Sequence, residues 1–415
     1  MSDPRAAIRD FLAAHRPHAE RFLRALVRTP SDNPPGDCAP HAMRAVELLE
    51  GLGYRVESHA VPQDEAAACG LRSCVNLVVR ERFGPGPVIA CNAHGDVVPP
   101  GGGWSVDPYG AEIRDGRMLG RGVAVSKSDF ATYAFALLAL KSASAHGAGL
   151  AGSVELHFTH DEEAGGTLGP AWLLRQGLVR PDYAICAGFA HGVTIAHNGC
   201  LHLEVAVRGR SGHAAEPEQG VDALEAATTI LAGLYELRRD YATTRSRIPG
   251  IGSPTLVVGL IDGGINTNVV PDRVVFRLDR RIIPEELASE AEETLTRRIV
   301  GLGARFPGVA VTVRRVLLAL PLLPLAGQEK LVEVLQRNAG TVLGEEIPVH
   351  GVPLYTDARH YSAAGIPTVL YGAGPPTLAE ANGHRADENL RLADLHAATE
   401  VVALSLYDLL AAPRA

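Results

Sequence analysis

The sequence predicts an α/β fold, in which a layered sheet with helices on both faces is interrupted by an inserted α+β domain of the split-βαβ (ferredoxin-like) type. A chain of 415 residues is too long for one simple core, so two domains are expected. Residues 1–199 and 318–415 alternate amphipathic helices with short apolar runs, whereas residues 200–317 have the order β-α-β-β-α-β. The first two segments should therefore form one domain, and the middle segment the inserted one.

The first α/β part is expected to begin with two helices. Residues 5–29 alternate apolar and basic positions at helical spacing, and the Pro and Gly residues at 31–37 separate them from a second helix at 40–53. Short apolar runs bounded by turn residues are typical of strands, and the apolar segment 130–141 is typical of a buried helix. The predicted strands are 54–61, 75–79, 88–90 and 153–158.

The inserted part is predicted from six elements in order. They are a half-solvated strand at 201–207, a helix at 223–238, strands at 255–261 and 273–279, a helix at 285–302 and a strand at 309–318. Such an order matches a compact sheet with two helices on one face. The α/β pattern then resumes with a helix at 328–343, a strand at 368–371 and a terminal helix from Leu392.

Composition excludes several classes of function. The net charge of −8 argues against nucleic acid or anionic lipid as the main partner. No apolar run approaches the roughly 18 residues that a membrane span needs, and residues 1–15 lack the apolar core of a signal peptide. The six cysteines are scattered and form no disulfide framework. We therefore expect a cytoplasmic protein with reduced thiols.

A His-Asp pair directly follows the apolar run 87–90. Side chains two residues apart on a strand point to the same side, so His94 and Asp96 should lie together. An imidazole that binds a metal usually has a carboxylate that fixes its tautomer, and this pair can supply one. The alternative is a surface His-Asp pair at a strand end.

The strand 153–158 leads directly to three acids, Asp161, Glu162 and Glu163. Acids at the end of a buried strand are costly unless a metal ion or charge partners neutralise them. Adjacent residues of an extended chain face opposite ways, so Glu162 and Glu163 should have different roles. One could bind a cation while the other takes a proton from a water. The alternative is a solvated acidic turn.

A third group of candidates lies near the end of the chain. The YGAG turn, with Gly372 and Gly374, offers free backbone N–H groups able to hold a carboxylate. His384 comes from a loop before the last helix, and a surface histidine is the alternative interpretation there.

Together these segments resemble the M20 metallopeptidase family of di-zinc aminoacylases, deacetylases, carboxypeptidases and dipeptidases. The matching segments follow the family's order over nearly the whole chain: HGDVVPPGGGW, DPYGAEIRDGRMLGRG, THDEEAGG, GRSGHAAEP, GGINTNVVPDRVVFRLDRR, YTDARHY and HRADE. The resemblance implies the family's fold and a homodimer formed through the inserted domain, which would also act as a lid.

Position by position, the resemblance also implies the roles of five residues. His94 matches a zinc ligand, and Asp96 matches the carboxylate that orients it. Glu162 matches the general base. Glu163 and His384 match ligands of the other zinc.

The resemblance places further candidates in the inserted domain. His213 is similar to the histidine that reaches into the neighbouring subunit's site to stabilise the oxyanion. Asn268 and Arg281 are similar to residues that grip a substrate carboxylate, helped by the Gly372–Gly374 turn. The chemistry of Arg281 agrees, since a guanidinium is the natural partner of a planar carboxylate.

Two departures from the family pattern change the expected metal site. The bridging aspartate of the family corresponds to Val125, and a further ligand corresponds to Gly188. Neither residue can bind a metal, so three ligands remain, divided between two positions. A structural zinc takes four protein ligands and a catalytic zinc about three, so we expect one divalent ion, such as zinc, or none.

Four other residues could supply a missing ligand: Asp129, His160, His191 and His197. Asp129 lies one helical turn past Val125, but it also fits the acid of a capping box that begins at Ser126. A structural role is the alternative for each histidine.

The leading hypothesis is an M20-like hydrolase that cleaves the amide bond of an N-acyl amino acid or a small peptide-like molecule with a free carboxylate. Glu162 would act as the general base beside at most one metal ion. One alternative is a metal-independent hydrolase, lyase or condensing enzyme on the same scaffold. Another is a non-catalytic protein that binds small acids.

Overall fold

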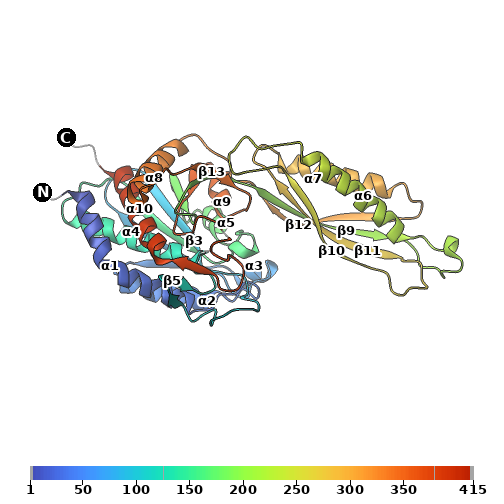
Figure 1. The fold of residues 1–415 in the computed structure, drawn as a ribbon, viewed down its shortest axis with the longest axis horizontal. Helices are drawn as coiled ribbons and strands as arrows, with labels where there is room; N and C mark the ends of the chain where they lie inside the picture. Colours follow the sequence, from blue (N-terminus) through green and yellow to red (C-terminus); the bar gives the residue numbers. More distant parts are fainter. Residues whose placement is uncertain (1–2, 125, 378, 412–415) are drawn as a thin grey trace. The chain divides into compact units, whose positions relative to one another are not determined.

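The computed structural model describes residues 3–124, 126–377 and 379–411 (Figure 1). Contacts within the chain divide it into two compact units. Unit 1 consists of Met1–Ile195, Pro324–His350 and Thr356–Ala415, and unit 2 consists of Ala196–Leu323 and Gly351–Tyr355.

An eight-stranded mixed sheet, in the order β1-β2-β6-β3-β7-β14-β8-β13, forms the centre of unit 1. Its strands are β1 (Val56–Ala60), β2 (Val75–Arg82), β3 (Val88–His94), β6 (Ser153–Thr159), β7 (Tyr183–Cys186), β8 (Val193–His197), β13 (Val349–Val352) and β14 (Thr368–Leu370). The central pairs β6–β3, β3–β7 and β7–β14 are parallel, whereas β1–β2 and β2–β6 are antiparallel. The structure thus confirms the predicted α/β class.

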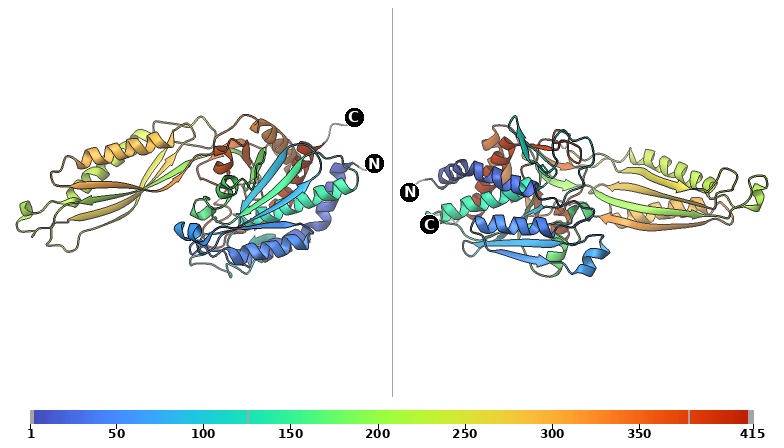
Figure 2. Two further views of the ribbon diagram at one scale, coloured as in Figure 1. Left: turned by 180° about the vertical axis from the view of Figure 1, so that it is seen from behind. Right: turned by 90° about the horizontal axis from the view of Figure 1, so that it is seen from below.

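Helices cover both faces of this sheet, as predicted. Alternate residues of β2 belong to different cores: Leu77 and Val79 join the larger core, and Val78 joins the smaller one. The larger core includes α1 (Pro4–Val27), α2 (Ala39–Gly51), α4 (Lys127–Ala145), α8 (Gln328–Leu343) and α10 (Leu392–Leu410) (Figure 2). The opposite face carries α3 (Gln63–Ala68), α5 (Pro170–Arg175) and α9 (Ala358–Ala363).

Helix α4 is apolar all round because it lies between the sheet and two other helices. It packs on β3 and β6 on one side and on α1 and α10 on the other. A helix buried in this way needs no polar face, which explains the run FATYAFALLAL. None of the helices in the described ranges combines the length and the apolar character that a membrane crossing requires.

A small three-stranded sheet, in the order β15-β5-β4, was not anticipated from the sequence. It contains β4 (Glu112–Arg114), β5 (Arg117–Leu119) and β15 (Asn389–Arg391). Between β4 and β5, Asp115 and Gly116 have φ of 49° and 72°, as an Asp-Gly hairpin turn requires. The pairing of β15 with β5 brings the segment after His384 beside the GRG motif.

Unit 2 has the predicted β-α-β-β-α-β order. Its antiparallel sheet, in the order β10-β11-β9-β12, is formed by β9 (Gly199–Arg208), β10 (Thr255–Gly263), β11 (Arg273–Ile282) and β12 (Ala310–Ala319). Helices α6 (Ala223–Tyr241) and α7 (Ala288–Gly303) share one core with this sheet (Figure 1). This arrangement confirms the split-βαβ prediction.

Candidate functional site

The candidate site lies where β3 and β6 end. The two strands are parallel neighbours, with His94 paired to Thr159, so the segments that follow them leave the sheet at the same edge. The N–H of Gly95 donates to the carbonyl of Thr159 at 2.8 Å. The HGD motif and the acid turn (residues 161–165) are therefore neighbours because of strand order.

Asp96 is fully buried and holds the acid turn in place. Its carboxylate accepts hydrogen bonds from the backbone N–H groups of Glu162 (3.2 Å) and Glu163 (3.1 Å) and from Asn33 Nδ2 (3.0 Å). Burial opposes ionisation, but the hydrogen bonds from His94 and Asn33 bring the pKa of Asp96 below its ordinary value. Asp96 is thus a carboxylate that orients both His94 and the acid turn.

His94 presents one ring nitrogen to Asp96 and the other to the acid turn. Nδ1 lies 3.0 Å from the backbone carbonyl oxygen of Asp96 and 3.4 Å from its Oδ1, and Nε2 lies 3.9 Å from Glu162 Oε2. Burial disfavours the charged imidazole, but the carboxylates of Glu162 and Asp96 raise the pKa of His94 well above its ordinary value. The ring is therefore oriented as a metal ligand would be, with Nε2 toward the acids.

Glu162 and Glu163 converge, which corrects the expectation that they face opposite ways. The chain leaves the strand at Thr159 and forms a short 3₁₀ turn, η1 (Glu162–Ala164), so the strand alternation no longer applies. Ligand atoms of His94, Glu162 and Glu163 all lie within 4.8 Å of one another. Burial raises the pKa of Glu162 well above its ordinary value; His94 opposes this and Glu163 adds to it.

His384 contacts one member of this group, Glu163. Its Nε2 lies 3.4 Å from Glu163 Oε1, and that hydrogen bond raises the pKa of His384. The residue has φ of 61°, so the loop turns sharply where the imidazole meets the acids. Nitrogen and carboxylate donors of this kind suit a divalent ion such as zinc, with Asp96 behind His94.

Of the two predicted departures, Val125 lies outside the described residues, and Gly188 has no room for a ligand. A Cβ at Gly188 would lie 2.8 Å from the backbone nitrogen of Tyr371 and 2.9 Å from the carbonyl carbon of Leu370. Close packing of β7 and β14 therefore excludes a carboxylate at this position.

Asp129 fills the space beside the YGAG turn, which corrects the expectation that this turn is free to hold a substrate carboxylate. Its carboxylate accepts the N–H of Ala373 at 2.7 Å, and a Cβ at Gly372 would lie 2.1 Å from Oδ1. The N–H of Gly374 donates to the carbonyl of Gly188 at 2.9 Å. The turn thus holds a carboxylate of the chain itself. The N–H groups of Ala373 and Gly374 are therefore not free to bind a substrate.

The capping box expected at the start of α4 is also absent from the described hydrogen bonds. Ser126 Oγ accepts the backbone N–H of His94 at 3.0 Å and donates to its carbonyl at 3.1 Å. The Ser126 hydroxyl therefore anchors the end of β3 instead of the helix.

Replacing Asp129 with Asn should stabilise unit 1 more at pH 8 than at pH 4. Burial raises the pKa of Asp129 to about 7 from an ordinary 3.8, so the folded chain binds this proton more tightly than the unfolded chain. Stability from that proton is fully present below about pH 4 and is lost as the pH rises to about 7. Asn carries no such titration, and urea unfolding across this range should show a difference of a few kcal/mol.

Asp240→Asn, at an exposed position in α6, provides the control for this comparison. An Asp129→Asn effect that does not change with pH would contradict the prediction.

His160 does not replace a missing ligand. Its Nδ1 lies 2.8 Å from the carbonyl oxygen of Val75, and its Nε2 lies 2.9 Å from Nδ1 of the buried His41. Burial lowers the pKa of His160 to about 4, so the pair is neutral. A Cβ at Gly95 would lie 2.7 Å from both rings, which explains why glycine stands between His94 and Asp96.

The other two candidate histidines have partners away from the acid turn. His191 pairs with Glu345 (2.6 Å) and Asp394 (3.3 Å) at the surface of unit 1. His197 belongs to unit 2, where its Nδ1 lies 2.9 Å from the carbonyl oxygen of Asn198.

The three remaining predicted residues lie in unit 2. His213 and Asn268 are exposed on neighbouring segments, and the N–H of Ala214 donates to the carbonyl of Asn268 at 3.1 Å. Arg281 donates from Nε and Nη2 to Asp279, at 3.0 and 3.2 Å. One edge of its guanidinium is thus already occupied, and the roles of these residues stay predictions.

Sequence reasoning missed a buried ion pair beside the site. Arg121 of the GRG motif and Glu388 of the HRADE motif are each 1% exposed and lie 2.6 Å apart. Glu388 also accepts the N–H of Ala124 at 3.1 Å. The Asp-Gly turn could have revealed the β4–β5 hairpin, but not the pairing of β15 with β5 that brings these two motifs together.

Buried polar contacts that the sequence did not predict also hold the acid turn. Asp161 accepts the N–H of Leu168 at 2.5 Å, and Arg359 donates to the carbonyls of Thr356 (2.7 Å) and Gly165. Burial raises the pKa of Asp161, and the nearby Asp357 adds to this. The YTDARHY motif therefore holds the acid turn in place through the hydrogen bond from Arg359 to the carbonyl of Gly165.

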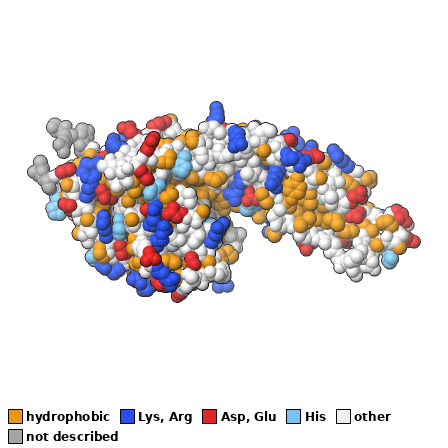
Figure 3. Space-filling view, in the orientation of Figure 1, with side chains coloured by type: hydrophobic (Ala, Val, Ile, Leu, Met, Phe, Trp, Pro, Cys, Tyr) orange, Lys and Arg blue, Asp and Glu red, His pale blue; other side chains and the backbone are white. Residues whose placement is uncertain are grey.

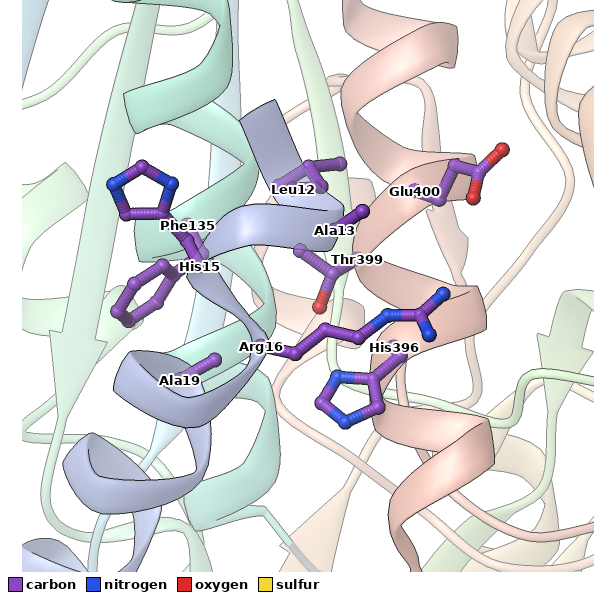
Figure 4. Close-up of a pocket in the computed structure, with 9 residues that line it drawn as sticks. All are labelled: Leu12, Ala13, His15, Arg16, Ala19, Phe135, His396, Thr399 and Glu400. Carbon is purple, nitrogen blue, oxygen red and sulfur yellow. The ribbon is translucent and has the colours of Figure 1, made fainter. Parts of the chain in front are cut away.

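A separate hollow beside α1 and α10 is lined by Leu12, Ala13, His15, Arg16, Ala19, Phe135, His396, Thr399 and Glu400 (Figure 4). Its acid Glu400 pairs with Arg9 at 2.9 Å, and His396 pairs with Glu20 at 2.9 Å. Both side chains are therefore already paired with residues outside the hollow.

Comparison with known proteins finds relatives over most of the chain. Residues 90–408 match the model of peptidase family M20/M25/M40. The chain is 28% identical over 358 residues to acetylornithine deacetylase of Proteus mirabilis, covering 85% of this chain and 86% of the relative. It is 29% identical over 396 residues to succinyl-diaminopimelate desuccinylase of Gluconacetobacter diazotrophicus, covering 93% and 95%.

Solved structures share the fold at low identity. The dipeptidase Dug1p of Saccharomyces cerevisiae superposes with a TM-score of 0.77 at 13% identity, over 100% of both chains. The M20 family metallo-carboxypeptidase Sso-CP2 of Sulfolobus solfataricus gives a TM-score of 0.74 at 17% identity, over 94% of this chain and 99% of that one.

Proposed function

The chain belongs to peptidase family M20/M25/M40, whose members hydrolyse C–N bonds, and from this premise we propose that it deacylates a small N-acyl amino acid or peptide-like substrate with a free carboxylate. The convergence of His94, Glu162 and Glu163 within 4.8 Å at the end of two parallel strands carries the proposal. The two relatives, a deacetylase and a desuccinylase, support an acylated amino acid as the substrate class.

Glu162 would act as the general base and then as the general acid. Burial raises its pKa, so its carboxylate binds a proton more readily than an exposed glutamate does. It would take a proton from the attacking water and return it to the departing amine. Asp96 fixes the position of Glu162 through the backbone N–H, at 3.2 Å.

His94, Glu163 and His384 would hold one divalent ion, which we take to be zinc. When bound, the ion would polarise the scissile carbonyl and lower the pKa of a water. The lack of space for a side chain at Gly188 supports a single ion. A metal-independent reaction on the same scaffold is the second candidate. Gly188 favours it as well, because this position offers no metal ligand.

Three residues of unit 2 would have the roles that the resemblance implies. His213 would stabilise the oxyanion, and Asn268 and Arg281 would bind the substrate carboxylate. A homodimer through unit 2 is supported by its edge strand β10, where Leu260 and Ile261 are 62% and 57% exposed. Figure 3 shows apolar side chains on the visible face of this unit.

A panel of N-acetyl and N-succinyl amino acids tests the proposal. With zinc added, we expect the full chain to hydrolyse some members of the panel. Each hydrolysis should release one free amine for each acyl group. Replacing the substrate carboxylate with its amide should lower kcat/KM by at least about tenfold, because a charge-assisted bond is lost. Unchanged turnover after complete metal removal would favour the metal-independent reaction. Thermal stabilisation by these acids without any turnover would favour a binding protein.

A further inference from the structure

A second group of metal-ligating side chains lies in unit 2, on the face of the sheet opposite α6 and α7. Cys200 and His202 are two residues apart on β9 and so point to the same side, away from core residues such as Leu201 and Leu203. On the neighbouring strand β11, Asp279 is paired directly with His202. Directly opposite residues share a face, so the three side chains form one cluster.

The donor atoms of this cluster are spaced almost as a zinc ion would space them. Cys200 Sγ lies 3.2 Å from His202 Nε2, His202 Nε2 lies 3.0 Å from Asp279 Oδ2, and Sγ lies 3.8 Å from that oxygen. Tetrahedral zinc with ordinary bond lengths to sulfur, nitrogen and oxygen separates these donors by about 3.3 to 3.6 Å. Shifts of a few tenths of an ångström would therefore accommodate the ion.

We propose that Cys200, His202 and Asp279 bind one zinc ion, with the fourth coordination position open to a water or a carboxylate ligand. Thiolate, imidazole and carboxylate are the donors that zinc takes in proteins, and three of them with one open position make a reactive rather than a structural site. The three ligands of this site are not among the residues proposed to carry out the hydrolysis.

The surroundings suit such a site. Arg281 donates from Nε to Asp279 Oδ1 at 3.0 Å and so orients the carboxylate, as outer partners of metal ligands do. Cys200 is buried, whereas the side chains of His202 and Asp279 are 37% and 31% exposed. Two of the three ligands are therefore accessible from solvent, and the sulfur lies 3.2 and 3.8 Å from their ligand atoms.

Cobalt substitution distinguishes this site from the acid turn of unit 1, because the proposed ligands there include no sulfur. We expect the full chain titrated with Co²⁺ to show a near-ultraviolet charge-transfer band from thiolate to cobalt. The intensity of this band should saturate at about one Co²⁺ per chain. The band should persist in Glu163→Gln, which alters the acid turn, and in Cys69→Ser, which removes an exposed thiol of unit 1. It should be lost in Cys200→Ser, and Co²⁺ affinity should fall at least about tenfold in His202→Asn.

Alkylation of the wild-type chain gives a second readout that needs no variant. Zinc should slow modification of Cys200 at least about tenfold, as measured by peptide mapping, and leave Cys69 unaffected. Absence of the cobalt band in the wild type, its survival in Cys200→Ser, or equal alkylation of Cys200 with and without zinc would overturn the proposal. The cluster would then be an ion pair between His202 and Asp279 beside a free thiol.

Discussion

Glu162→Gln should lower kcat on the preferred N-acyl amino acid by about 10²- to 10⁴-fold, the contribution of a general base. Glutamine has the same shape but cannot take a proton from water. Its backbone N–H would still donate to Asp96, so the acid turn should keep its geometry. KM should therefore change little, and steady-state kinetics would separate the two parameters.

The pH dependence provides a second measurement on the same variant. Because burial raises the pKa of Glu162, kcat/KM of the wild type should fall as the pH decreases through that raised value and the base becomes protonated. The residual kcat/KM of Glu162→Gln should not show this fall at low pH. Glu65→Gln, in the short helix α3, is the matched control and should behave as the wild type. Full activity of Glu162→Gln would rule out the proposed role.

Arg121→Met should lower the free energy of unfolding of unit 1 by about 3–5 kcal/mol, the largest stability effect that we expect. Arg121 and Glu388 are each 1% exposed, so the substitution leaves a buried carboxylate without its counter-ion. The segment with His384 ends beside Glu388, so metal binding should weaken as well. Both tryptophans, Trp104 and Trp172, belong to unit 1, and their fluorescence in urea reports its unfolding.

Two comparisons make this prediction specific. The double variant Arg121→Met/Glu388→Leu removes both charges and should recover most of the lost stability. Arg44→Ala breaks a pair with Glu47 whose side chains are 42% and 62% exposed, and should cost less than about 1 kcal/mol. A double variant as unstable as Arg121→Met, or an Arg44→Ala effect of equal size, would contradict the argument.

Much of the candidate site could be predicted because its residues follow strand ends. His94 and Asp96 come directly after β3, and the acid turn comes after its parallel neighbour β6. Motifs at the carboxyl ends of adjacent parallel strands must meet, whatever the rest of the chain does. His384 carried no such local signal, and only its place in the family pattern identified it.

Other features depended on contacts between distant segments. The YGAG turn is not free to bind a substrate carboxylate, because Asp129, from a distant segment, accepts the N–H of Ala373. Glu162 and Glu163 do not face opposite ways, because the strand ends before them and they lie in a 3₁₀ turn, where side chains do not alternate.

The sequence by itself determined the α/β class and the inserted split-βαβ unit, and it predicted that His94 and Asp96 lie together, because hydrophobic periodicity and local motifs are properties of short segments. Only the tertiary structure decided which buried charges are paired and which carboxylates converge. Arg121 meets Glu388, and Cys200 meets Asp279, through strand register across long stretches of chain. Such pairings depend on register and packing, which no single segment encodes.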